Sequence, residues 1–103
     1  MKRVLVTPHA RGQALEIELW WLEHRDKAPF LFAQELEAAF SVLSNTPKAG
    51  RRWPHATELG VRRYPLATTR YHLYYREEEN DVTILAVWGG PRGTGPDLGY
   101  RPF

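Results

Sequence analysis

The chain has 103 residues, of which 43% are hydrophobic and 25% charged, and its formal net charge is +2. These values are typical of a globular chain and argue against a wholly disordered one, and a chain of this length is expected to bury a single core. The sequence contains no Cys, which excludes disulfide bonds, thiolate metal sites and a Cys nucleophile.

A short strand is the first expected element. Residues 1–3 are Met, Lys and Arg, and a short apolar run, Val4 to Val6, follows. This run is too brief for a signal-peptide core and far too brief for a membrane span. We therefore expect an N-terminal strand in a cytoplasmic protein that has no contact with a membrane.

An amphipathic helix is expected next. Thr7 followed by Pro8 is a helix start, because Thr accepts a hydrogen bond from a free amide and Pro suits the first helical position. Leu15, Leu19 and Leu22 recur at intervals of four and three residues, which predicts a helix to about His24 with these leucines on its apolar stripe. Three further apolar residues widen that stripe: Ile17, Trp20 and Trp21.

A second helix should follow after a short connection. Asp26, placed before Ala28 and Pro29, is a possible start. The helical stripe is formed by Phe32, Leu36, Ala39, Phe40 and Leu43. Residues 45–47 (Asn, Thr, Pro) and Gly50 then mark its end. Together the two helices predict a helical hairpin.

The hydrophobic period changes from helix to strand after Gly50. Three strands are expected, within Glu58 to Leu66, over Arg70 to Glu77 and over Val82 to Trp88. Polar turns at residues 67–69 and 78–81 would join them into an antiparallel meander. Pro65 places the first strand at a sheet edge or ends it early, and the apolar third strand is the best candidate for the sheet centre.

The last residues have a different composition. Residues 89–103 hold five Gly and three Pro, which predicts a C-terminal tail without helix or strand. The whole order predicts an α+β, two-layer fold with an N-terminal strand, a helical hairpin and a three-strand, mainly antiparallel meander.

Charge is distributed unevenly along the chain. Between Ala10 and Ser44 acidic residues outnumber basic ones, whereas between Lys48 and Arg76 seven basic residues face Glu58 as the one acid. The second half should therefore carry the positive field.

One strand alternates in an informative way. Arg70, His72, Tyr74 and Arg76 occupy alternate positions of the second meander strand, so they should share one face. Arg62 or Arg63 on the first strand could lie across from them, and residues 51–53 (Arg, Arg, Trp) lead in. Arginine and aromatic side chains suit a nucleic acid or an acidic protein segment. The alternative is a solvated face whose charges pair with residues 77–79 or with acids of the helices.

Metal and cofactor chemistry have little support in the sequence. The four His have no metal-type spacing, and Glu35 and Glu37 are two apart on a helix and so do not share a face. We expect no metal or cofactor, and the catalytic residues stay unknown. His72 alone could act as a general base in RNA cleavage, with arginines stabilising the phosphorane.

An ordered set of segments resembles a known family. The segments are Thr7-Pro8, "ELEAAFSVL" ending at "NTPKAGR", then "GVRRYPL", "TRYHLYYRE" and "VTILAVWGGPRG". Together they resemble the ParE/RelE superfamily of toxins from bacterial type II toxin-antitoxin modules, also described as plasmid stabilisation proteins. The resemblance implies one toxin domain over residues 1–98, in which the N-terminal strand lies beside the last meander strand and both helices cover one sheet face. It also implies a cognate antitoxin.

Two branches of that family imply different mechanisms. RelE-like members resemble ribosome-dependent endoribonucleases, which use an Arg and a Tyr, or a His-Tyr pair, after the last strand. Arg92 occupies the Arg position here, but Leu98 stands near the place of the Tyr, and Tyr100 lies slightly beyond.

ParE-like members resemble inhibitors of DNA gyrase that trap cleaved DNA without catalysis, and the lack of the catalytic set favours this branch. The residues expected to bind the target are Arg62, Arg63, Arg70, His72, Tyr74, Arg76 and Arg92. A ribosome-dependent mRNA endoribonuclease and a non-toxic nucleic-acid or protein interaction module remain alternatives.

Overall fold

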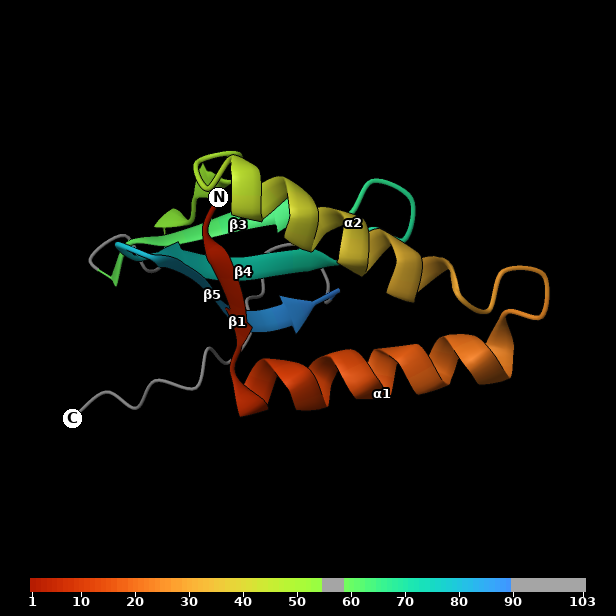
Figure 1. Cartoon of the computed structure of the whole chain (residues 1–103). Coiled ribbons are helices and arrows are strands. Elements are labelled where there is room, and N and C mark those ends of the chain that lie inside the picture. Colours follow the sequence, from red (N-terminus) through yellow and green to blue (C-terminus); the bar gives the residue numbers. More distant parts are fainter. Residues whose placement is uncertain (55–58, 90–103) are drawn as a thin grey trace.

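The computed structural model describes residues 1–54 and 59–89. Its elements, in chain order, are β1 (Arg3–Val6), α1 (Pro8–His24), α2 (Leu31–Asn45), β2 (Arg51–Arg52), β3 (Val61–Pro65), β4 (His72–Glu77) and β5 (Asp81–Trp88). The strands form one sheet in the order β1-β5-β4-β3-β2 (Figure 1). Strand β1 runs parallel to β5, and the other neighbours are antiparallel. The α+β fold expected from the sequence is confirmed, with the two-residue β2 as an addition.

Helix α1 begins where the sequence predicts. The Thr7 hydroxyl accepts a hydrogen bond from the backbone N–H of Ala10 at 3.1 Å, which satisfies one of the amides that the first helical turn leaves unpaired. Pro8 is the first helical residue, where its missing N–H costs nothing. The helix ends at His24, also as expected. Among the described residues, no helix is long and apolar enough to cross a membrane.

The side of α1 that packs on the sheet is not the leucine stripe. The packed side is formed by Ala10, Ala14, Ile17 and Trp21. The side chains of Leu15, Leu19 and Leu22 are 54%, 49% and 43% exposed. The expectation that these leucines face the core is wrong, whereas Ile17 and Trp21, expected on the same wide stripe, do pack against it. Because α1 is apolar on both sides, the helical period fits either one, and the small Ala10 lets the helix approach the sheet closely.

Helix α2 begins later than expected. Residues 25–30 form two tight turns, with hydrogen bonds from Ala28 N–H to the Arg25 carbonyl and from Leu31 N–H to the Ala28 carbonyl. Asp26 therefore does not start the helix, because the chain needs these turns to reverse direction. The core stripe of α2 is as predicted, with Phe32, Ala39 and Leu43 buried.

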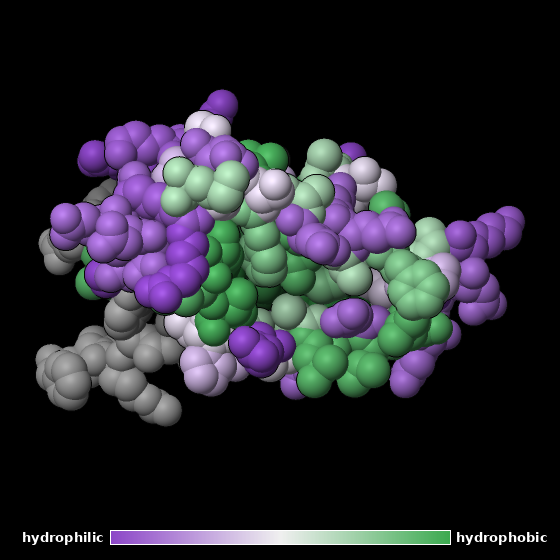
Figure 2. All heavy atoms as spheres, viewed as in Figure 1, coloured by the Kyte–Doolittle hydropathy of each residue, from purple (hydrophilic) through white to green (hydrophobic). Residues whose placement is uncertain are grey.

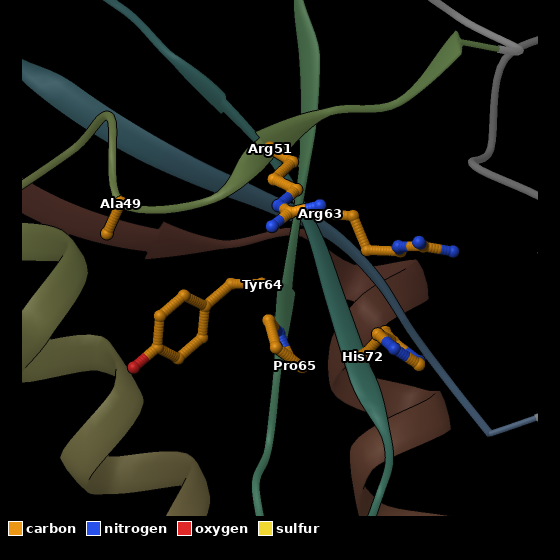
Figure 3. A pocket seen from close by; sticks show the side chains of 6 residues that line it. All are labelled: Ala49, Arg51, Arg63, Tyr64, Pro65 and His72. Atoms are coloured by element: carbon orange, nitrogen blue, oxygen red, sulfur yellow. The ribbon is translucent and has the colours of Figure 1, made fainter.

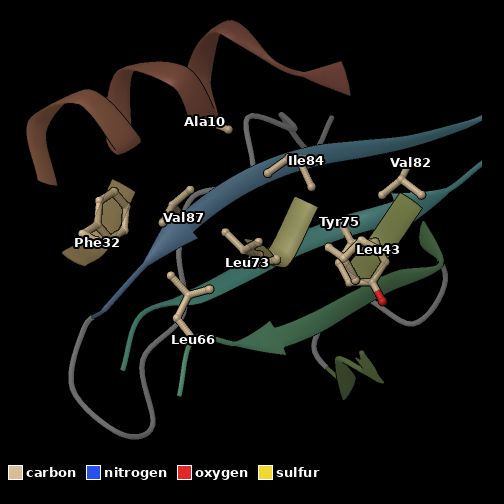
Figure 4. Close-up of a cluster of buried hydrophobic side chains, with 10 residues drawn as sticks. Ala10, Phe32, Leu43, Leu66, Leu73, Tyr75, Val82, Ile84 and Val87 are labelled. Carbon is tan, nitrogen blue, oxygen red and sulfur yellow. The ribbon is translucent and has the colours of Figure 1, made fainter. Parts of the chain in front are cut away.

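The main core lies between the two helices and one face of the sheet (Figure 4). Leu73 and Tyr75 of β4 and Ile84 and Val87 of β5 contribute fully or almost fully buried side chains to it. Strand β5 is flanked on both sides, by β1 and β4, as its apolar sequence predicts. The middle strand of the five is nevertheless β4, because β2 adds a second strand beyond it.

The opposite face of the sheet carries a second apolar cluster. It is formed by Trp53, Val61, Tyr74, Leu85 and Ala86, with Trp88 packed against it. Tyr74 is only 1% exposed, and its ring lies 4.9 Å from that of Trp53 in an edge-on arrangement. The expectation that Tyr74 points outward with the basic side chains is therefore wrong.

An irregularity in β5 supplies part of this cluster. Tyr74 pairs with Ala86 and Tyr75 with Ile84, so that Leu85 is an extra residue in the strand. Such a β-bulge lets two successive residues serve one face. Leu85 and Ala86 accordingly both join the second cluster, while Ile84 joins the main core.

Candidate functional site

Strand pairing brings Arg63 and His72 to one face of the sheet. Arg63 pairs with Tyr74, and Pro65 pairs with His72, in the antiparallel ladder of β3 and β4. Directly paired residues point to the same side, so Arg63 and His72 lie on the face of the second cluster. The predicted association of these two residues is therefore observed.

Arg62 lies on the opposite, helix-covered face. It pairs with the core residue Tyr75, and its guanidinium donates a hydrogen bond to the Gly50 carbonyl at 2.8 Å. Of the two arginines considered from the sequence, only Arg63 can join His72. Arg62 instead stabilises the chain that leads into β2.

Arg70 lies in a turn rather than in a strand. Strand β4 begins at His72, and Arg70 has a φ of 69°, a left-handed conformation that non-glycine residues seldom adopt. The Arg70 N–H donates to the Leu66 carbonyl at 3.0 Å, which closes the turn that joins β3 to β4. Its side chain is exposed.

The remaining predicted residues are not gathered at one place. The Arg76 guanidinium lies 3.9 Å from the Glu78 carboxylate, towards the other end of β4 from His72. Tyr74 is buried, as described above. Arg92 lies outside the described residues, as do residues 90–103 of the tail predicted over residues 89–103.

Arg51 also belongs to this site, although the sequence indicated only that it leads into the strand that carries Arg63. Arg51 pairs with Arg63 in the ladder of β2 and β3, so the two guanidinium groups extend from directly opposed positions on one face. Arg52 pairs with Arg62 on the other face. A strand of two residues gives no periodic signal, so the facing of Arg51 could not be predicted from the sequence.

A hollow of about 430 Å³ lies beside these side chains (Figure 3). The residues that line it are Ala49, Arg51, Arg63, Tyr64, Pro65 and His72. The pairing of β2 with β3 ends at Arg63, before Tyr64 and Pro65. The hollow thus forms where β3 continues past the end of its short neighbour.

A second, smaller hollow adjoins the first. It measures about 190 Å³ and is lined by Pro65, Leu66, Ala67, Arg70 and His72. Pro65 and His72 line both hollows. We refer to the two together as the basic groove, since their described lining contains three arginines, one histidine and no carboxylate.

His72 lines both hollows of the groove, and its protonation depends on its surroundings. Partial burial lowers its pKa below the ordinary value of 6.5, and the positive charge of Arg63 lowers the pKa further, so the neutral form of the imidazole predominates at pH 7. Within residues 1–54 and 59–89, no carboxylate hydrogen-bonds to the His72 ring to orient it. A neutral imidazole can donate or accept one hydrogen bond, but this one lacks the carboxylate partner typical of a general base.

Glu35 of α2 holds the turn that carries Arg70. Its carboxylate accepts hydrogen bonds from the backbone N–H groups of Thr68 and Thr69 at 2.7 and 2.9 Å, and from the Thr69 hydroxyl at 2.6 Å. Burial raises the pKa of Glu35, but the hydrogen bonds from Thr69 and Thr68 lower it by more. The carboxylate therefore stays ionised and fixes the turn beside the groove.

A different surface is apolar. Leu15, Leu19 and Leu22 form an exposed stripe along α1, and Figure 2 shows apolar side chains gathered along this helix. Near its end, the Trp20 ring stacks on His24 at 4.7 Å, and the Arg25 guanidinium lies 4.8 Å from the same ring. Exposed apolar patches of this kind are typical of surfaces that bind another protein.

A metal site finds no support in the part of the chain that the structure describes. There, no three side chains of His, Asp or Glu lie close enough together to hold an ion. The described residues that line the basic groove also include no carboxylate, a side chain that commonly binds Mg²⁺ or Ca²⁺.

Comparisons with known proteins agree with this fold. No curated protein sequence matches the chain. A solved structure described as the chromosomal ParDE toxin-antitoxin system from P. aeruginosa is similar, with a TM-score of 0.71 and 18% identity over 84% of this chain and 94% of the other. The family model described as ParE toxin of type II toxin-antitoxin system, parDE, matches residues 4–92. On that match over most of its length, the chain belongs to the family of ParE toxins of type II toxin-antitoxin systems.

Proposed function

We propose that this chain is the toxin of a toxin-antitoxin module, that it stops growth by inhibiting DNA gyrase, and that a cognate antitoxin neutralises it. The observation that carries the proposal is the family match over residues 4–92. The residues proposed to contact the target are Arg63, Arg70 and His72, which line the basic groove, together with Arg76 and Arg92 as predicted from the sequence. Tyr74 is buried and Arg62 lies on the helix-covered face, so neither is proposed as a contact.

Inhibition without catalysis agrees with the chemistry of the site. Cleavage of RNA needs a group that removes a proton and one that returns it. His72 is the one histidine that lines the basic groove in the described part of the chain, and it has no carboxylate to orient it. A toxin that acts by binding needs neither group.

The exposed leucine stripe of α1 supports an antitoxin partner. Leu15, Leu19 and Leu22 leave about half of each side chain in water, at 54%, 49% and 43% exposure. An amphipathic segment of a partner could bury them and gain roughly 25 cal/mol for each Å² of apolar area removed from water. The matched structure from P. aeruginosa is that of a ParDE system, which makes an antitoxin the natural candidate for this partner.

Purified gyrase tests the mechanism. Increasing amounts of the chain should inhibit supercoiling of plasmid DNA and raise the amount of linear DNA released when gyrase is digested. In cells, expression without a partner should produce filaments and a DNA damage response. Gyrase that remains fully active at saturating toxin would rule out this target.

A ribosome-dependent endoribonuclease is the second candidate. One observation favours it: His72 lines the same hollow as Arg51 and Arg63. A neutral imidazole can accept a proton. Nearby guanidinium groups can stabilise the charge of a phosphorane. Primer extension on translated messages would then show cuts in phase with codons. Intact messages in growth-arrested cells would exclude this activity.

A further inference from the structure

The basic groove holds like charges that no described carboxylate neutralises. Arg51 and Arg63 stand directly opposite each other in the β2–β3 ladder, an arrangement of like charges that is destabilising. The ion pairs of the described residues involve Lys2, Arg3, Lys48 and Arg76, and neither of these two arginines. A bound anion would remove the repulsion.

A third arginine, Arg70, lines the same groove from a turn with a left-handed backbone conformation. Arg70 adopts a φ of 69°, in which a glycine or asparagine would be more stable. Glu35 fixes this turn through Thr68 and Thr69. Strained residues held by their surroundings are typical of binding sites, and here the strained residue is a cation that lines the groove beside His72.

The size and chemistry of the groove fit phosphate groups. Its larger hollow, about 430 Å³, lies within the range of pockets that bind small ligands, roughly 300–1,000 Å³. A guanidinium binds two phosphate oxygens at once through its planar fork. Ala49 and Pro65 provide an apolar wall that a sugar could contact. Two adjoining hollows, each with at least one arginine, match a ligand that carries phosphates in succession.

We propose that the basic groove binds the phosphodiester backbone of a nucleic acid strand, through Arg51 and Arg63 in one hollow and Arg70 in the next. The proposal deepens the function proposed above and rests on it for its biological role, since an inhibitor of gyrase would then contact the DNA as well as the enzyme. Binding of the strand itself requires no gyrase, so it can be tested alone.

The test measures fluorescence anisotropy of labelled oligonucleotides with the purified full chain. Single-stranded DNA, duplex DNA and RNA of one sequence are compared at several salt concentrations. The wild type should bind at least one of them, with affinity that falls as salt rises, because phosphate contacts release counterions. Arg63→Gln and Arg51→Gln should each weaken binding roughly tenfold and reduce the salt slope by about one.

Arg52→Gln is the matched control. Arg52 neighbours Arg51 on β2 and is exposed, but it pairs with Arg62 on the other face. Its loss removes the same charge without touching the groove, so affinity should change less than about twofold. If Arg52→Gln lowers the affinity as much as Arg51→Gln does, binding depends on net charge alone and the proposed site is wrong. Thermal unfolding verifies that all three variants are folded.

A competing acidic peptide separates the two classes of ligand. A polyglutamate peptide should displace the oligonucleotide only at much higher concentration than unlabelled strand. Stronger binding of the peptide, sensitive to Arg63→Gln, would overturn the proposal in favour of a protein ligand. Absence of binding to every oligonucleotide at low salt would also overturn it.

The gyrase assay keeps the two proposals apart. If the chain binds oligonucleotides through Arg63 but leaves gyrase active, the proposed nucleic-acid site stands and the proposed target is wrong. If the chain inhibits gyrase but binds no oligonucleotide at any salt concentration, the proposed target stands and the proposed nucleic-acid site is wrong.

Discussion

Tyr75 joins the segment after α2 to the middle of the sheet. Its hydroxyl donates a hydrogen bond to the Pro47 carbonyl at 2.7 Å and accepts one from the Gly50 N–H at 2.8 Å. A Cβ on Gly50 would lie 2.6 Å from this hydroxyl and 2.8 Å from the Arg63 carbonyl. The contact therefore requires glycine, and it sets the position from which Arg51 reaches the groove.

Tyr75→Phe should destabilise the protein. The change leaves the buried Gly50 N–H without its acceptor, and an unsatisfied buried donor costs about 1–3 kcal/mol. Denaturant unfolding followed by circular dichroism measures this cost. Tyr64→Phe is the control, because no hydrogen bond of its hydroxyl is found among the described residues, and it should cost less than about 0.5 kcal/mol. Equal losses for the two variants would contradict the role given to the Tyr75 hydroxyl.

Arg70→Gly should have opposite effects on stability and binding. Glycine relieves the left-handed backbone strain and should raise the free energy of unfolding by about 1 kcal/mol. The same change removes a cation of the basic groove, so oligonucleotide affinity should fall. Arg70→Lys is the comparison, since it keeps both the strain and the charge. If Arg70→Gly gains stability and keeps full affinity for the oligonucleotide, Arg70 does not contribute to binding in the groove.

Helix α1 has two apolar sides, and only one is buried by the fold. Leu19 lies on the exposed side, so Leu19→Glu should change the free energy of unfolding by less than about 0.5 kcal/mol. Ile17 packs against the core, so Ile17→Ala should cost about 2–4 kcal/mol. If the antitoxin binds the leucine stripe, Leu19→Glu should abolish co-purification of the two proteins while the toxin stays folded. Retained co-purification would place the antitoxin elsewhere.

The same helix shows what the sequence can and cannot predict. Periodicity located α1 and its first residue correctly, because Thr7 and Pro8 act locally. It was right for Ile17 and Trp21, which pack against the core, and wrong for the three leucines, because Ala10 and Ala14 at another spacing also fit the helical period. The choice between them depends on how closely the helix approaches β5, a tertiary property.

Alternation along a strand predicts which side chains share a face of the sheet, but it does not predict whether that face is covered. Alternation along β4 correctly separated His72 from Leu73, so the association of His72 with Arg63 could be predicted. Alternation does not reveal what covers a face, so the burial of Tyr74 under Trp53 could not. The left-handed turn at Arg70 and the short β2 also lack any periodic signal, and they position half of the basic groove.

At the scale of the whole molecule, Glu77 connects three segments that are distant in the sequence. Its carboxylate forms ion pairs with Lys2 at 2.9 Å and with Lys48 at 2.7 Å, which join the N-terminus and the segment after α2 to the end of β4. The hydrogen bonds from Lys48 and Lys2 lower the pKa of Glu77 from 4.5 to about 2. The carboxylate is therefore more acidic in the folded chain than in the unfolded one.

This difference predicts a loss of stability in acid. Because the pKa is lower in the folded state, Glu77 stabilises the fold above pH 4.5, and the stabilisation is lost as the pH falls towards 2. Glu77→Gln should lower the free energy of unfolding by about 1 kcal/mol at pH 7 and flatten its dependence on pH in that interval. Glu79→Gln, at an exposed neighbouring position, should leave the dependence unchanged. A wild-type curve that matches that of Glu77→Gln would exclude this contribution.

The exposed leucines of α1 also bear on how the protein behaves when it is overproduced. A chain that leaves the ribosome and folds alone still presents Leu15, Leu19 and Leu22 to water and to every other copy. At the concentrations of overproduction, such copies are expected to aggregate. If the proposed antitoxin binds this stripe, co-expression of the two proteins would cover the leucines of each new toxin molecule before it meets another copy, and would raise the yield of protein that stays in solution.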